Sequence, residues 1–215
     1  MALALNALIK CVHNSLEEVC NEFQEISGIS CDQMPEYLLT AGLYRSLKKL
    51  KSVGWVKPEA NIKESMSEAG ALGRGKFPEA LNEAGRFDIF VYDTSGAPIG
   101  AIEVKNTINA HTRIASDLSR LRSALKKSPN SSTIQYVGMA FLVANGGGAR
   151  KSAGERVDTR AHNIGERFFE LDYQRAKEGI YRYGEDGGPE SYTYRVSEAE
   201  DESFRFASCF WVLTR

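Results

Sequence analysis

The sequence predicts an α/β domain in which a mixed central β-sheet is flanked by helices. Segments with helical spacing of apolar residues alternate with short apolar runs of the β type. One pair of strands forms a predicted hairpin, so these two strands are antiparallel. A helix and a further strand follow the hairpin, and a helical crossover of this kind joins parallel strands. The 215 residues are 42% hydrophobic, which is enough to bury one substantial core. We therefore expect a single domain over residues 1–215.

Two helices are expected in the N-terminal part of the chain. Apolar residues recur at spacings of three and four over residues 2–27, as in an amphipathic helix, and Gly28 ends that helix. Asp32 as N-cap and Pro35 in the first turn predict a second helix. Its leucine stripe ends near Lys51. Each helix has an apolar face that must pack against the rest of the domain.

The clearest local signal in the sequence is a β-hairpin. A short strand is expected around residues 55–56, and residues 58–84 lack sustained periodicity and are predicted to be mostly loop. Residues 86–93 and 98–106 are apolar β-type runs, and the segment 94–97 between them has Ser-Gly at its centre. Such a pattern is typical of two antiparallel strands joined by a tight turn.

Helix and strand alternate in the rest of the chain. Helical spacing returns over residues 112–127, and a strand follows at 136–144. A polar helix is expected at about 155–178, and aromatic-rich strands at 191–197 and 203–213 form a C-terminal β-hairpin. The sheet should therefore contain parallel and antiparallel pairs.

The hairpin turn sets the register of the two strands. A loop centred on Ser95-Gly96 pairs positions whose numbers sum to 191, which places Asp88 opposite Glu103. Because strand side chains alternate, Lys105 lies on the same face. All three side chains are expected at the end of the hairpin away from its turn.

These three residues predict a magnesium site. Their neighbours along both strands are apolar, so the strands should be central in the sheet, where two opposed carboxylates repel unless a cation holds both ionised. Magnesium takes carboxylate oxygens, waters and substrate phosphates as ligands. Lys105 could position or deprotonate an attacking water, or stabilise charge in the transition state. The alternative is a cross-strand salt-bridge cluster without catalytic function.

Asp88, followed after a strand and turn by Ile102-Glu103-Val104-Lys105, resembles the motif of the PD-(D/E)XK superfamily of restriction-endonuclease-like nucleases. The segment 85–91 stands where that superfamily has its first catalytic Asp, although the Pro of the name is absent. The resemblance implies a magnesium-dependent endonuclease acting on DNA, in which manganese can substitute. Restriction of foreign DNA and DNA repair are the roles it suggests.

The resemblance also divides the chain. It implies a restriction-endonuclease-like catalytic core at 33–144, an N-terminal helical extension at 1–30, and a C-terminal helix and strands at 145–215. Family members often add a carboxylate from the helix before the hairpin, and Glu36 matches that position. Glu36 could instead simply favour the N-terminal turn of its helix. Residues that could contact substrate phosphates are Arg74, Lys76, Asn106, His111, Arg113 and Arg120. The alternative is a flexible surface loop for the first two and a solvated helix face for the others.

Composition restricts the partners. The formal net charge is −1, so any basic surface must be local, and a lone subunit should bind DNA weakly and in a salt-sensitive way. A homodimer or a DNA-binding partner protein is therefore plausible. The sequence has neither a membrane-spanning stretch nor a secretion signal, and the four cysteines lack metal-ligand spacing, which favours a cytoplasmic protein.

Other motifs in the sequence give weaker support to other functions. Residues 70–76 fit the start of a P-loop, but Phe77 replaces the Ser or Thr that binds magnesium, and Pro78 follows. Gly146-Gly147-Gly148 could cradle a phosphate or serve as a hinge. The competing function is a non-catalytic module on the same fold that binds nucleic acid or protein.

Overall fold

The computed structural model describes residues 4–72, 77, 79–81, 84–127, 131–146, 151–173, 190–197 and 204–215. These residues form an α/β fold with a six-stranded mixed sheet, which confirms the predicted class. The helices are α1 (Leu5–Ser27), α2 (Glu36–Leu47), α3 (Ile62–Glu68), α4 (Ala115–Lys127) and α5 (Ala153–Tyr173). The strands are β1 (Val53–Asn61), β2 (Arg86–Asp93), β3 (Pro98–Thr107), β4 (Tyr136–Gly146), β5 (Glu190–Val196) and β6 (Phe204–Thr214).

The order of strands in the sheet is β1-β2-β3-β4-β6-β5. The first three strands form an antiparallel meander, and β4, β6 and β5 are also antiparallel neighbours. The central pair, β3 and β4, is parallel, because the chain crosses over through α4 between them. The two strands that flank the predicted site are thus central, as their apolar composition indicated.

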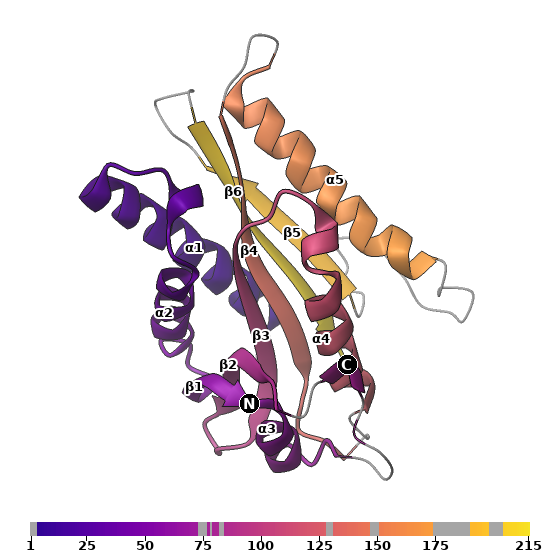
Figure 1. The fold of residues 1–215 in the computed structure, drawn as a ribbon. Coiled ribbons are helices and arrows are strands. Elements are labelled where there is room, and N and C mark those ends of the chain that lie inside the picture. The colour runs from indigo at the N-terminus through magenta and orange to yellow at the C-terminus, as the bar shows by residue number, and fades with distance from the viewer. Residues whose placement is uncertain are drawn as a thin grey trace.

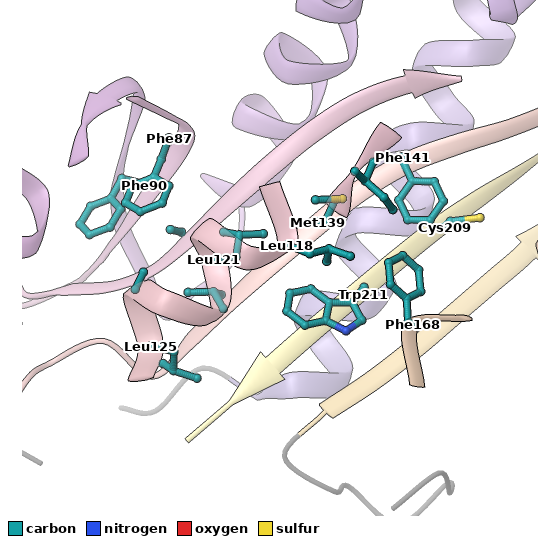
Figure 2. Packing of buried hydrophobic residues seen from close by; sticks show 14 of the residues in the cluster. Phe87, Phe90, Leu118, Leu121, Leu125, Met139, Phe141, Phe168, Cys209 and Trp211 are labelled. Carbon is teal, nitrogen blue, oxygen red and sulfur yellow. The ribbon is translucent and has the colours of Figure 1, made fainter. Parts of the chain in front are cut away.

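Helices cover both faces of the sheet. Figure 1 shows α1 and α2 on one face, and α4 and α5 on the other. Buried residues form one cluster on each side, and the cluster under α4 and α5 contains the aromatic side chains of Phe141, Phe168 and Trp211 (Figure 2). The other cluster joins α1 and α2 to the sheet through Leu16 and Leu43. A layer of helices therefore packs on each face of the sheet (Figure 1).

The predicted start of the second helix needs correction. The second helix begins at Glu36 and not at Asp32, which instead lies in a short 3₁₀ turn, Cys31–Gln33. Pro35 has φ −62° and ψ 133°, an extended conformation, so the α-helix can begin only after it. The first helix does end where predicted, at a left-handed Gly28 with φ 67°.

The sequence predicts mostly loop over residues 58–84, and for the described residues of this segment that prediction is wrong. The strand β1 continues to Asn61, and the seven-residue helix α3 follows. Pro58 does not end β1 because this strand lies at the edge of the sheet, where a missing N–H is tolerated. Asn61 caps α3 by accepting a hydrogen bond from the Glu64 N–H at 3.0 Å, but a helix of two turns is too short to show periodicity. No helix in the described part of the chain is long and apolar enough to cross a membrane.

Candidate active site

The hairpin has the predicted register. Near the site, Ile89 pairs with Ile102 and Phe90 with Ala101, so the position numbers sum to 191 as expected. Next to the turn, Tyr92 pairs with Pro98 and the sum is 190, so the predicted sum holds at the site because a bulge follows between Val91 and Tyr92. The paired backbone ends at Ile89, and a side chain continues the contact: the Val104 N–H donates to Asp88 Oδ2 at 2.7 Å. Asp88 is therefore anchored to β3 at the level of Glu103.

Glu103 is a buried carboxyl group whose side chain is only 1% exposed. Burial raises its pKa to about 8, the nearby Asp88 carboxyl adds to that increase, and the charge of Arg120 opposes it. Arg120 Nη2 lies 2.8 Å from Glu103 Oε1, but the angles are not those of a hydrogen bond. Among the described residues, Oε1 consequently has an ionic contact but no hydrogen-bond partner.

Lys105 lies in a carboxylate environment. Its Nζ is 3.5 Å from Glu36 Oε1 and 3.7 Å from Asp117 Oδ2. Burial by itself lowers the pKa of Lys105, but the surrounding carboxylates, with Glu36 and Asp117 foremost, raise it above its ordinary value. The side chain is therefore held as an ammonium ion.

Glu36 reaches the site from the first turn of α2. Its Oε2 accepts a hydrogen bond from the Asn106 N–H at 3.0 Å, in addition to the Lys105 contact. The Asn106 side chain donates to the carbonyls of Asp32 and Met34, so it fastens β3 to the turn before α2. Asn106 thus has a positioning contact here, and substrate contact by this residue remains a prediction.

Asp117 is a site residue that the sequence interpretation missed. It lies in the first turn of α4, where it contacts both Lys105 and Arg120, the latter at 2.8 Å. The sequence does contain a signal for Asp117. This residue lies three residues before Arg120 on the predicted helix that follows the motif, a spacing at which two side chains on a helix can pair. Arg120 had been proposed as a phosphate contact, but its guanidinium lies against Glu103 and Asp117.

The charges of this cluster do not balance. Once Glu103 has lost its proton, as metal binding requires, Glu36, Asp88, Glu103 and Asp117 contribute four negative charges, while Lys105 and Arg120 contribute two positive charges, which leaves −2. One divalent cation would neutralise that excess. The cluster is therefore electrostatically suited to a metal ion of charge +2.

The donor set also fits magnesium. In the part of the chain that the structure describes, no three His, Cys, Asp or Glu side chains are grouped as a metal site. Asp88 and Glu103 are together, whereas Glu36 is held by Lys105 and Asn106, so a third carboxylate ligand remains a prediction. Magnesium commonly uses only one or two protein carboxylates, with waters and phosphates as its other ligands. Glu103 Oε1, which has no hydrogen-bond partner among the described residues, is an acceptor that such an ion would share with the Arg120 guanidinium.

Of the remaining candidates, Arg113 is the one whose side chain the structure describes. Arg113 is exposed in a 3₁₀ turn, His111–Arg113, just before α4. The side chain of His111 lies outside what the structure describes, as do Arg74 and Lys76. Comparisons with protein-family models, with curated proteins and with solved structures found no match to this chain.

Proposed function

We propose that this protein is a magnesium-dependent endonuclease of the PD-(D/E)XK type that hydrolyses phosphodiester bonds in DNA, with manganese as a substitute metal. The observation that carries the proposal is the register of the hairpin, which places Asp88 at the level of Glu103, with Lys105 two residues further along β3. The order helix, strand, hairpin, helix, strand, present as α2, β1, β2–β3, α4 and β4, supports a restriction-endonuclease-like core.

The residues of the candidate site would have separate roles in the reaction. Asp88 and Glu103 would hold the metal, which supplies positive charge to the phosphoryl group and to the attacking water. Lys105 would donate hydrogen bonds to the phosphoryl oxygens and stabilise the charge that develops there. Its raised pKa favours this role over that of a general base, which would require a neutral amine.

The test is cleavage of supercoiled and linear DNA by purified protein in magnesium, manganese or chelator. Asp88→Ala and Lys105→Ala should each reduce the magnesium-dependent rate by at least about 100-fold, with circular dichroism spectra unchanged. Matched controls are Lys57→Ala, a lysine on the neighbouring strand β1, and Asp158→Ala on α5, which should cleave at the wild-type rate. Undiminished cleavage by both site variants would contradict the proposal.

One observation favours the competing function, a non-catalytic binding module. Arg120 already pairs with Glu103, as in a self-sufficient salt-bridge cluster. A module of this kind predicts no metal-dependent cleavage by the wild-type protein under any of these conditions. The same assay therefore decides between the two functions.

A further inference from the structure

A basic cleft of about 500 Å³ lies between α5 and the segment that follows β3. Its charged lining residues are Lys151, Arg156, Arg160 and Arg167, and no Asp or Glu is among the described residues that line it. Asparagine and threonine side chains make up most of the remaining lining. For a chain with a net charge of −1, this is a strong local concentration of positive charge.

The positive charge follows one stripe of α5. Arg156, Arg160, Asn163 and Arg167 are separated by four, three and four residues, so they share one face of the helix. The buried face is separate and includes Val157 and Phe168. The helix is therefore polarised, with one side for the core and another for the cleft.

Three acidic residues in the described part of α5 have partners that do not line the cleft. Glu155 accepts a hydrogen bond from the Ser152 N–H at 2.8 Å in an N-terminal capping box. Asp158 accepts from the Tyr194 hydroxyl at 3.0 Å, and Glu166 lies 3.4 Å from His162.

The cleft opens at the same end of the parallel strands as the candidate active site. Asn109, which lines it, follows Lys105 by four residues, a distance of at most about 14 Å along the chain. Arg160 donates to Asn109 Oδ1 at 2.9 Å and to the Ala144 carbonyl at 3.2 Å, which ties α5 to the ends of both strands. Since one DNA strand advances about 3.4 Å per nucleotide, about four nucleotides would span the separation.

We propose that this cleft binds the phosphate backbone of a nucleic acid, next to the phosphate that is cleaved. Arginine, asparagine and threonine side chains are the groups that position phosphate backbones without reading bases, so binding here should be independent of sequence. This inference rests on the proposed function, since it extends the path of the same substrate. It also explains how a chain without excess positive charge can hold a polyanion.

Binding can be tested separately from cleavage, by fluorescence anisotropy of a labelled DNA duplex in chelator at several salt concentrations. The variant is Arg156→Gln combined with Arg167→Gln, both at exposed positions. The control is Lys10→Gln combined with Arg45→Gln, which removes the same charge from exposed positions on α1 and α2. The cleft variant should bind at least about tenfold more weakly, with a salt slope shallower by one to two, because each lost phosphate contact removes about 0.9.

A gain of function provides a second test. Asn163→Arg adds a cation to the exposed stripe and should tighten DNA binding several-fold and steepen the salt slope by about one. The proposal is overturned if the cleft and control variants bind DNA equally. It is also overturned if the cleft variant loses only affinity for pyrophosphate, since the cleft would then hold a small anion.

The two proposals fail in distinguishable ways. If the wild-type protein binds DNA through the cleft but never cleaves it, the nuclease proposal fails and the cleft proposal stands. If the cleft variant binds and cleaves DNA like the wild-type protein, the cleft proposal alone fails.

Discussion

At the residue scale, the protonation of Glu103 controls whether the candidate site can accept a cation. Its pKa of about 8, raised by burial and by Asp88, means that a proton occupies the carboxyl group at neutral pH. A metal ion must displace that proton. Affinity for Mg²⁺ or Mn²⁺ should therefore rise about tenfold per pH unit below pH 8 and level off above it.

Calorimetric titration with Mn²⁺ between pH 6 and pH 9 measures this dependence. Glu103→Gln should bind the metal weakly and without the pH dependence, because a carboxamide has no proton to lose in this range. An affinity of the wild-type protein that is constant from pH 6 to pH 8 would show that Glu103 is not a ligand.

Asp117 should act as a positioning residue for Lys105. Asp117→Asn removes one of the two carboxylates that hold the ammonium and weakens the arrangement of Arg120. We expect kcat for DNA cleavage to fall about tenfold. KM should change less than twofold, because the contacts of the Asp117 side chain are with Lys105 and Arg120.

Steady-state kinetics of Asp117→Asn, Asp117→Glu and the surface control Asp158→Asn measure this effect. The glutamate variant should recover part of kcat, since it restores the carboxylate. A change confined to KM would assign Asp117 to substrate binding instead.

At the element scale, a buried histidine joins α1 to the β5–β6 edge of the sheet. The Ser208 hydroxyl donates to Glu17 at 3.0 Å, so the His13 Nδ1–H must donate to Ser208 Oγ, 2.9 Å away. The other ring nitrogen then accepts from the Thr193 hydroxyl at 2.9 Å. Burial, assisted by the charge of Arg195, lowers the pKa of His13 to about 4, so the ring is neutral.

This contact should make the protein less stable in acid. The unfolded chain binds a proton at His13 below pH 6.5, whereas the folded protein resists it down to about pH 4. The contribution of neutral His13 to the free energy of unfolding is therefore complete above pH 6.5 and is lost as pH falls toward 4. Between pH 7 and pH 5 the loss is about 2 kcal/mol.

Urea unfolding at pH 7 and pH 5 measures the loss. His13→Gln should reduce the difference between the two pH values by most of that amount. His162→Gln, at an exposed position on α5, is the matched control and should leave the difference unchanged. Equal pH dependence in all three proteins would contradict the assignment.

At the scale of the whole molecule, the sheet separates two cores that share no residue. Leu16 of α1 belongs to one cluster and Phe168 of α5 to the other, and both are fully buried. The helix α1, expected as an extension of the catalytic core, contributes a large part of the first cluster. Both helical layers should accordingly contribute to one cooperative unfolding transition.

Leu16→Ala should reduce the free energy of unfolding by about 2–5 kcal/mol, and Phe168→Ala by about 3–5 kcal/mol. Because the two side chains have no shared partners, the double variant should show the sum within about 0.5 kcal/mol. Chemical denaturation followed by two spectroscopic probes measures these values. A negligible effect of Leu16→Ala would show that α1 unfolds apart from the rest.

The sequence by itself determined the α/β class and the hairpin, because alternation along a strand and a short turn are local properties. The register that brings Asp88 to the level of Glu103 also depends on a bulge between Val91 and Tyr92, which the structure adds. Tertiary structure alone decided the surroundings of that pair. Glu36 meets Asn106 across 70 residues of chain, and Arg120 turns toward Glu103 and Asp117. The basic cleft likewise exists only because α5 packs beside the end of β3. Charged side chains pair with the groups that lie nearest to them in space. When the two partners come from separate elements, the sequence pattern does not give the distance between them.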